Sequence, residues 1–339
     1  MKGELSKKDL RIGFIGAGSI GSLFGGYLAD IKSDTYSMEI IFFCPKSHAE
    51  EINRHGLKLS VDQQTKVIEN IQAYENEKII LEKVENNSSF RFDFIFLTTK
   101  AYDSESAIIQ YKKIVEASKW LVILQNGIGN EDIVIPYCEK SKIMRIVTTV
   151  GAFLSKPGHV THTGKGITNI GFAFLNNLSA NKIIKEQAKL DLIILKDLLI
   201  LAGFNTEVVE DIIAKSWEKV LVNIGINALG ALTRLPNGKL LESKGLKSIM
   251  EASINETITV AKRMKIDLAK RNYLEATYDV ARKTSENKNS MLQDILNKKP
   301  TEIEFINGRI LKYAEKLGIS VTINALLTYL IRALEKSTM

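Results

Sequence analysis

The feature that most constrains the fold is a glycine-rich turn near the N-terminus. GAGSIG at positions 16–21 follows an apolar run, Leu10–Ile15, and opens an amphipathic stretch, Ser19–Ala29. A strand, a G-x-G-x-x-G turn and a helix in that order are typical of a Rossmann dinucleotide-binding unit. The first glycine permits the tight turn, the second lets the backbone approach a diphosphate, and the third packs helix against strand. We therefore predict a dinucleotide site with the diphosphate at the helix N-terminus. Its residues are Gly16, Gly18, Ser19, Ile20 and Gly21.

Further apolar runs extend this pattern through the first half of the chain. Runs of this kind, separated by helical stretches, indicate a parallel sheet covered on both faces. The more polar, alternating stretch between Gly56 and Val84 predicts a small excursion from the sheet. The predicted strands are Glu39–Cys44, Phe92–Thr98, Leu121–Gln125 and Ile143–Gly151.

The second half of the chain has a helical pattern from about Asp211 onward. The sequence therefore predicts an α/β protein, with an N-terminal Rossmann-type doubly wound parallel sheet followed by an all-α C-terminal domain. We expect a dinucleotide domain at 10–210 and a substrate domain at 211–339, sharing a hinge and a cleft. The predicted helices are Ala214–Leu232, Ser248–Lys265, Leu268–Thr284 and Thr301–Leu317, with loops at 235–238 and 287–290.

Composition narrows the class of protein further. The 339 residues exceed one ordinary core, which agrees with two domains. The net charge of +7 is spread over alternating lysines and glutamates, without the basic stripe and aromatics that nucleic acid requires. The two cysteines, Cys44 and Cys138, match no metal spacing and suit a reducing compartment, both free and buried. The polar first nine residues and the lack of a long apolar run predict a cytoplasmic protein with neither signal peptide nor membrane span.

The end of the second predicted strand bears on the choice of cofactor. An NAD-type site usually has Asp or Glu there, to bind the ribose hydroxyls. This strand continues as Phe43-Cys44-Pro45-Lys46-Ser47, without a carboxylate. Lys46 therefore favours NADP, through the 2′-phosphate; the alternative is that Lys46 is an ordinary surface lysine.

Two later strands also end in polar residues. Thr98-Thr99-Lys100 ends one strand, and QNGIG at 125–129 ends the next. Ligands of open parallel sheets bind at the carboxyl ends of strands, so Lys100 and Asn126 are candidates to orient a nicotinamide or a substrate carbonyl. The alternative for Asn126-Gly127 is a plain turn, which this dipeptide favours.

The most informative stretch of the second half is WEKVLVNIGIN at 217–227. Lys219, Asn223 and Asn227 are spaced i, i+4, i+8, so they share one face of an otherwise apolar helix. Such a polar stripe needs either a ligand site or a buried network between helices. Of the four histidines, His48 and His55 follow the second strand, toward the adenosine end, and His159 and His162 have no obvious carboxylate partner nearby in sequence. A lysine ammonium is therefore the better candidate to protonate a developing alkoxide.

Together these motifs resemble the ketopantoate reductase family, from Arg11 to about Gly318. The resemblance rests on GAGSIG at 16–21, TK at 99–100, QNGIG at 125–129, WEKVLVNIGINAL at 217–229, LPNG at 235–238 and SMLQDILNKKPTEIEFING at 290–308. It implies that NADPH delivers a hydride to C2 of 2-dehydropantoate, giving pantoate for pantothenate and coenzyme A synthesis. A related NAD(P)-dependent reductase of another small 2-oxo acid, and a non-catalytic NADP-binding sensor, are the alternatives.

The resemblance also implies roles for individual residues. Lys219 matches the family's proton donor and Glu302 the glutamate beside it. Lys100 and Asn126 match cleft residues on the cofactor side. Family members commonly carry an arginine just after the second strand to hold the 2′-phosphate, whereas this chain reads Cys44-Pro45-Lys46 there. The matched substrate contacts are Asn223, Asn227, Asn237, Asn287 and Ser290, the last suited to the carboxylate. The helical domain could serve a homodimer, or its apolar faces could simply form core.

Overall fold

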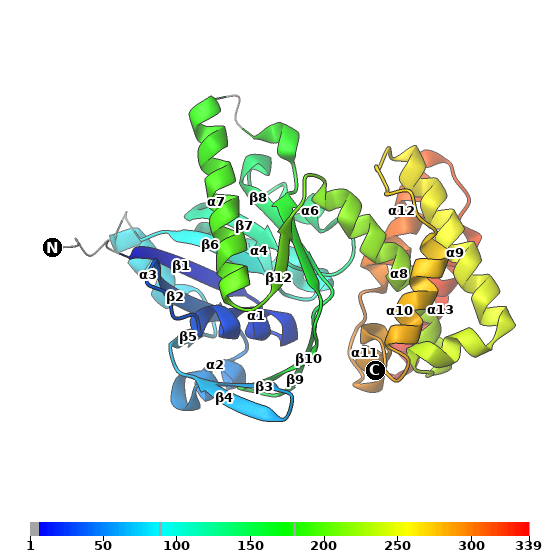
Figure 1. Ribbon diagram of the computed structural model, residues 1–339, viewed down its shortest axis with the longest axis horizontal. Coiled ribbons are helices and arrows are strands. Elements are labelled where there is room, and N and C mark those ends of the chain that lie inside the picture. Colours follow the sequence, from blue (N-terminus) through cyan, green and yellow to red (C-terminus); the bar gives the residue numbers. More distant parts are fainter. Residues whose placement is uncertain (1–6, 88–89, 179–180, 339) are drawn as a thin grey trace. The chain divides into compact units, whose positions relative to one another are not determined.

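The computed structural model describes residues 7–87, 90–178 and 181–338 and divides the chain into two compact units (Figure 1). Unit 1 comprises Met1–Gln125 and Glu131–Ile212, and unit 2 comprises Asn126–Asn130 and Ile213–Met339. The short segment 126–130 therefore belongs to unit 2, although both of its flanks belong to unit 1. Six of the nine polar N-terminal residues, 1–6, lie outside the described residues.

Unit 1 is built on an eight-stranded sheet of order β12-β11-β8-β7-β6-β1-β2-β5. The strands progress outward from β1 in both directions, which confirms the doubly wound arrangement. Its strands are β1 (Lys8–Ile15), β2 (Tyr36–Phe43), β5 (Ile71–Tyr74), β6 (Phe92–Leu97), β7 (Ser118–Ile123), β8 (Ile143–Thr148), β11 (Ile167–Phe172) and β12 (Asn205–Val208).

One pairing departs from the parallel sheet that the sequence predicts. β11 pairs antiparallel with β8, whereas the other neighbouring strands are parallel. A parallel neighbour needs a crossover connection, usually a helix. Residues 149–166 instead form a hairpin, β9 (Gly151–Lys156) and β10 (His159–Gly164), so the chain returns in the opposite direction.

A second, four-stranded sheet of order β4-β3-β10-β9 lies in the same unit. β3 (Leu57–Val61) and β4 (Gln64–Ile68) form an antiparallel pair, which confirms the predicted excursion after Gly56. β10 joins this pair through a parallel contact with β3.

Helices α1 and α7 cover one face of the large sheet with aromatic and aliphatic side chains (Figure 1). Phe24 of α1 stacks on Phe204 with ring centroids 4.1 Å apart. Beneath them Phe14 of β1 contacts Phe42 and Phe96 on the neighbouring strands. Each such burial contributes about 1.5–3 kcal/mol relative to exposure. The helices of the sheet region are α1 (Ser19–Ala29), α2 (Lys46–His55), α3 (Lys78–Asn86), α4 (Ser104–Gln110), α5 (Lys112–Glu116), α6 (Asn130–Val134) and α7 (Lys182–Leu201).

Unit 2 is helical around a large apolar core with a smaller cluster at Leu221, Ile254 and Tyr273, which confirms the predicted all-α second half. Its helices are α8 (Ile212–Thr233), α9 (Lys244–Arg263), α10 (Tyr273–Lys283), α11 (Ser290–Leu296), α12 (Asn307–Leu317) and α13 (Thr322–Thr338). Within the described part of the chain, no helix has both the length and the apolar character needed to cross a membrane.

Several helix boundaries differ from the sequence prediction: α9 starts at Lys244 rather than Ser248, and α13 was not predicted. α10 starts at Tyr273 rather than Leu268, because Asn272 caps it by accepting from the Glu275 amide. Ser290, expected in a loop, begins α11, which Asn289 caps through the Leu292 amide. The helix expected from Thr301 is a short 3₁₀ turn, Ile303–Phe305, followed by α12.

Candidate active site

The glycine turn of unit 1 has the strain and close contacts that explain its first and third glycines. Gly16 has φ +90°, and a Cβ there would lie 2.6 Å from the Thr99 amide nitrogen. A Cβ on Gly21 would lie 2.5 Å from Thr98 Oγ1, whose hydroxyl donates to the Gly16 carbonyl at 2.8 Å. Both positions therefore exclude larger residues because of the protein itself.

Gly18 differs, because no described residue lies close enough to exclude a side chain there. The nearest atom to a Cβ built there is the Gly16 carbonyl oxygen, 4.0 Å away. Helix α1 begins at the next residue without a side-chain cap and without an acidic residue in its first turn. Space beside a glycine and a bare helix N-terminus together suit the diphosphate of a dinucleotide. Ser19 lies at this N-terminus, and its Oγ accepts from the Leu154 amide at 3.1 Å.

The end of β2 forms a second helix N-terminus close to this turn. The Gly16 amide donates to the Phe43 carbonyl at 2.9 Å, which joins the turn to the end of β2. α2 then starts at Lys46 after Pro45, again without a side-chain cap or an acidic first turn. Lys46 and Ser47 are exposed, so the cationic and hydroxyl groups are available to an anion.

The ends of β6 and β7 are joined by the Gln125 side chain. Its Nε2 donates to the Thr99 carbonyl at 2.9 Å and to Ser104 Oγ at 2.7 Å. Its Oε1 is buried and has no hydrogen-bond partner among the residues that the structure describes. Lys100 follows Thr99 as the residue before a 3₁₀ turn and is half-buried.

In unit 2, three predicted site residues form a hydrogen-bonded array. Lys219 Nζ donates to Asn126 Oδ1 at 2.5 Å, and Asn126 Nδ2 donates to Glu302 Oε2 at 3.5 Å. An ammonium only donates and a carboxylate accepts, so this orientation of the amide suits both neighbours. The sequence grouped Asn126 with cofactor-side residues, whereas its side chain joins the lysine of α8 to the glutamate preceding α12.

The backbone of segment 126–130 is fixed against other parts of unit 2. The Ile128 amide donates to the Phe305 carbonyl at 3.0 Å, and Arg309 donates to the Gly129 carbonyl at 3.2 Å. Asn130 Nδ2 donates to the Asn126 carbonyl at 2.9 Å. Because the Asn126 backbone is held in this way, its side chain is directed at Lys219 before any ligand binds.

The other two residues of the polar stripe share α8 with Lys219. Asn223 is half-buried and Asn227 is 5% exposed. Their i+4 and i+8 spacing from Lys219 places them on its face of the helix. Unit 2 therefore presents an ammonium and two carboxamides along one line.

The remaining predicted substrate contacts lie in one loop cluster. Asn237 is buried; its Nδ2 donates to Thr284 Oγ1 at 2.9 Å, and its Oδ1 accepts from Asn289 at 3.4 Å. Asn287 and Ser290 are exposed, and the Asn287 carbonyl accepts from the Asn237 amide at 3.0 Å. Sequence reasoning missed Asn289, which also donates to the Ile226 carbonyl of α8 at 3.4 Å.

The two glutamates of the Thr-Glu-Ile-Glu motif have different surroundings. Glu302 is 6% exposed and faces Asn126. Glu304 instead forms a two-bond ion pair with Arg332, at 2.5 and 2.9 Å. The Arg332 hydrogen bonds lower the pKa of the Glu304 carboxyl. Glu304 therefore anchors the motif, and Glu302 is the carboxylate that faces Asn126.

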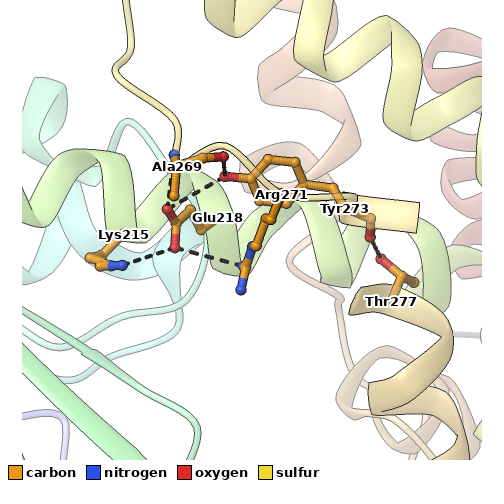
Figure 2. A network of polar contacts seen from close by, with 6 residues as sticks. All are labelled: Lys215, Glu218, Ala269, Arg271, Tyr273 and Thr277. Atoms are coloured by element: carbon orange, nitrogen blue, oxygen red, sulfur yellow. Dashed lines mark hydrogen bonds and ion pairs between the residues drawn. The ribbon is translucent and has the colours of Figure 1, made fainter. Parts of the chain in front are cut away.

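The residue beside Lys219 anchors α8 from its other side (Figure 2). Glu218 is 7% exposed and accepts from Lys215 Nζ at 3.1 Å and from the Ala269 amide at 3.3 Å. The Arg271 guanidinium lies 3.7 Å from the same carboxylate. Successive helical residues point about 100° apart. By holding Glu218, this network therefore fixes the rotation of α8 at which Lys219 points toward Asn126. In the sequence, the only sign that Glu218 has a structural role is its position next to Lys219.

Neither cysteine belongs to this set of polar residues. Burial raises the pKa of the Cys44 thiol to about 12 and that of Cys138 to about 11. Cys138 is only partly buried, so the prediction of two buried thiols holds for Cys44 alone. Among residues 7–87, 90–178 and 181–338, no group of three or more His, Cys, Asp or Glu side chains could hold a metal ion.

A Rossmann-type unit with a glycine turn, followed by a helical unit carrying a lysine–amide–carboxylate array, defines the class of nicotinamide-dependent oxidoreductases. Residues 12–173 match the family model "Ketopantoate reductase PanE/ApbA", and residues 211–335 match its C-terminal counterpart. The chain belongs to the ketopantoate reductase family.

Individual relatives agree with this family over almost the whole chain. The chain is 35% identical over 335 residues to the 2-dehydropantoate 2-reductase of Pyrococcus horikoshii, covering 96% of this chain and 98% of that protein. It is 32% identical over 326 residues, with the same coverage, to the 2-dehydropantoate 2-reductase of Archaeoglobus fulgidus.

Two solved structures share the fold. The ternary complex of D-mandelate dehydrogenase with NADH and anilino(oxo)acetate has a TM-score of 0.83 at 25% identity, covering 97% of this chain and 99% of that one. The PanE/ApbA family ketopantoate reductase from Ralstonia eutropha JMP134 has a TM-score of 0.80 at 25% identity, with the same coverage.

Proposed function

We propose that this chain is an NADPH-dependent 2-dehydropantoate 2-reductase, which reduces the C2 ketone of 2-dehydropantoate to the hydroxyl of pantoate. The observation that carries the proposal is the Lys219–Asn126–Glu302 array, in a chain that aligns end to end with curated reductases of this name. Pantoate then serves pantothenate and coenzyme A synthesis. Two free cysteines support a reducing compartment, the cytoplasm.

Lys219 supplies the proton that the reaction consumes. A nicotinamide held at the glycine turn would supply the hydride for C2, which leaves the electron pair of the C=O bond on the ketone oxygen. The Lys219 ammonium donates one N–H to Asn126, and its other N–H groups are chemically able to donate to that oxygen. Transfer of a proton from Nζ completes the hydroxyl, and such acid catalysis contributes about 10²–10⁴-fold in rate.

Asn126 and Glu302 have supporting roles in this proposal. The amide holds the ammonium in one rotamer, and Glu302 keeps the amide oxygen turned toward Nζ by accepting from Nδ2. Lys219, Asn126 and the buried Glu302 thus form one continuous chain of hydrogen bonds. Asn223 and Asn227, on the Lys219 face of α8, are proposed to bind the substrate hydroxyl, and Ser290 its carboxylate.

NADPH is favoured over NADH by the end of β2. The strand carries no terminal Asp or Glu; Lys46, Ser47 and the bare N-terminus of α2 follow instead. A phosphate bound there would interact favourably with the backbone amides of the helix N-terminus and with the lysine ammonium. Lys46→Ala is therefore expected to raise KM for NADPH while leaving KM for NADH nearly unchanged.

A reductase of another 2-oxo acid is the second candidate. The observation in its favour is the likeness to D-mandelate dehydrogenase, whose structure holds NADH and a 2-oxo acid derivative. A non-catalytic NADP sensor is disfavoured because it has no use for a proton donor, yet Lys219 and Glu302 are both present.

The test is a steady-state comparison of NADPH and NADH with 2-dehydropantoate and a panel of 2-oxo acids, including that of mandelate. We expect the highest kcat/KM with NADPH and 2-dehydropantoate. Lys219→Ala should lower kcat by about 10²–10⁴-fold, and Lys262→Ala, which changes an exposed lysine of α9, is the matched control. A K219A enzyme as fast as K262A would exclude Lys219 as the acid, and a higher kcat/KM for another acid would favour the second candidate.

A further inference from the structure

A buried histidine outside the array described above contacts the glycine turn indirectly. His48 of α2 is 3% exposed. Its Nδ1 accepts from the Gly158 amide, in the β9–β10 turn, at 2.8 Å. Its Nε2 lies 3.0 Å from Ser22 Oγ, and Ser22 is fully buried on α1.

The partners of His48 determine which nitrogen carries the proton. A backbone amide can only donate, so Nδ1 must offer its lone pair and the ring is neutral with hydrogen on Nε2. Nε2–H then donates to Ser22 Oγ, whose own hydrogen is directed to the Ala17 carbonyl at 2.9 Å. Burial also lowers the pKa of His48, in agreement with a neutral ring. The result is a one-directional relay from the Gly158 amide to the glycine turn.

The last acceptor of this relay lies inside the predicted diphosphate site. Ala17 stands between Gly16 and Gly18, so holding its carbonyl fixes the plane of the Ala17–Gly18 peptide. The Gly18 amide donates to the Gly16 carbonyl at 2.7 Å, and the Ser22 amide donates to the Gly18 carbonyl at 2.8 Å. The turn therefore depends on one side-chain hydroxyl for the orientation of its middle peptide.

The relay also joins two helix N-termini. His48 is the third residue of α2, whose first residue is Lys46, and Ser22 is the fourth residue of α1. The two helices start at the proposed ribose-phosphate and diphosphate sites. A hydrogen bond between these helices keeps the two anion sites at a constant separation.

We propose that Ser22 and His48 are positioning residues for the dinucleotide, holding the Ala17 carbonyl so that the turn and the N-terminus of α1 are pre-formed for the diphosphate. The inference rests on the proposed cofactor site and adds residues that do not touch the cofactor. Because the diphosphate is common to NADPH and NADH, loss of the relay weakens both dinucleotides by a similar factor.

Substitution of His48 by each of two neutral amide residues separates its hydrogen bond to Ser22 from its hydrogen bond to Gly158. In His48→Gln the amide nitrogen takes the place of Nε2, so the bond to Ser22 is kept and that to Gly158 is lost. In His48→Asn the amide oxygen takes the place of Nδ1, so the Gly158 bond is kept and the Ser22 bond is lost. Each variant loses one buried hydrogen bond, so a merely structural role predicts similar effects of the two.

The measurement is the Kd of the full-length protein for NADPH and for NADH, from cofactor fluorescence, with the thermal unfolding of each cofactor-free variant alongside. H48N should raise both Kd values about tenfold, and H48Q should bind nearly as the unaltered chain does. Ser22→Ala should match H48N, and the S22A/H48N double variant should be no weaker than either single variant.

Equal Kd values for H48N and H48Q would overturn the inference, and so would unchanged binding by S22A. An increase confined to NADPH would also overturn it, since that result would assign the effect to the phosphate site at Lys46. Dinucleotide binding without turnover of any 2-oxo acid would refute the proposed function alone, whereas a chain that binds neither dinucleotide would refute both.

Discussion

The sharpest stability prediction concerns an ion pair in the interior of unit 1. Arg145 of β8 is 1% exposed, lies between Ile123 of β7 and Gly171 of β11, and pairs through Nη1 with Oε1 of Glu131, which is 6% exposed. Its Nη2 also donates to the Gln125 carbonyl at 3.5 Å. The proposed perturbation is Arg145→Met, which keeps much of the volume and removes the charge.

The expected loss follows from the burial of the partner that remains. With Arg145 gone, the Glu131 carboxylate stays in a site shielded from water, and breaking a buried pair in this way costs about 3–5 kcal/mol. For a unit of roughly 200 residues, about 1 kcal/mol shifts Tm by about 2–4 °C. The expected fall in Tm is therefore about 6–20 °C. Glu131→Leu in the same chain removes the stranded charge and should restore most of the loss.

Circular dichroism melts and urea titrations of the cofactor-free protein measure this effect. The matched control is Arg54→Met, since Arg54 lies 3.9 Å from Glu50 with both side chains largely exposed. Such surface pairs contribute at most about 1 kcal/mol. The reasoning is refuted if R145M and R54M lose the same stability, or if R145M/E131L melts no higher than R145M.

Three further predictions test single features. Burial lowers the pKa of His48 in the folded state, so the unfolded chain binds the proton first when the pH drops below about 6.5. The contribution of His48 to stability is therefore complete above the unfolded-state pKa. It is lost as the pH decreases toward the folded-state pKa. Urea titrations should show a smaller acid loss for H48Q, and an identical pH dependence would contradict this assignment. Gly16→Ala, at φ +90° and against the Thr99 backbone, should raise the Kd for NADPH at least about tenfold, so an unchanged fluorescence titration would argue against the strained turn. Glu218→Ala should lower the free energy of unfolding by about 1–3 kcal/mol. Glu218→Gln keeps an acceptor for the Ala269 amide and should lower it less. Equal losses for the two variants would show that this hydrogen bond contributes nothing.

Much of the fold was predictable because its signals are local. The turn at Gly16 and the apolar runs indicated the Rossmann-type sheet, and the 3.6-residue periodicity after Asp211 indicated helices. The antiparallel strand β11 (Ile167–Phe172) was not predictable, because direction depends on the intervening hairpin rather than on the strand's own residues. The start of α11 at Ser290 was missed for a different reason: Asn289 reads as a loop residue until its side chain is seen to cap the helix.

The candidate site was predictable where its residues follow a regular spacing. Lys219 and Asn223 were found because a polar stripe on an apolar helix is visible in one sequence. Glu302 came from the family resemblance, since nothing local separates it from Glu304, whose partner Arg332 lies 28 residues further on. His48 and Ser22 were out of reach, because a relay between residues 26 positions apart leaves no periodic trace.

Segment 126–130 shows why one motif supported two interpretations in the sequence. Asn126-Gly127 is a turn, since Gly127 and Gly129 have φ of +85° and +76°. Those glycines also permit close packing: a Cβ on Gly127 would lie 2.5 Å from the Phe305 carbonyl oxygen, and one on Gly129 would lie 2.6 Å from the Arg309 guanidinium. The turn therefore brings Asn126 into contact with Lys219, so the turn interpretation and the site interpretation of this motif are compatible. It follows that Gly127 and Gly129 act on the Lys219–Asn126–Glu302 array through close packing, as Gly16 and Gly21 act on the turn of unit 1, although neither Gly127 nor Gly129 carries a reactive group.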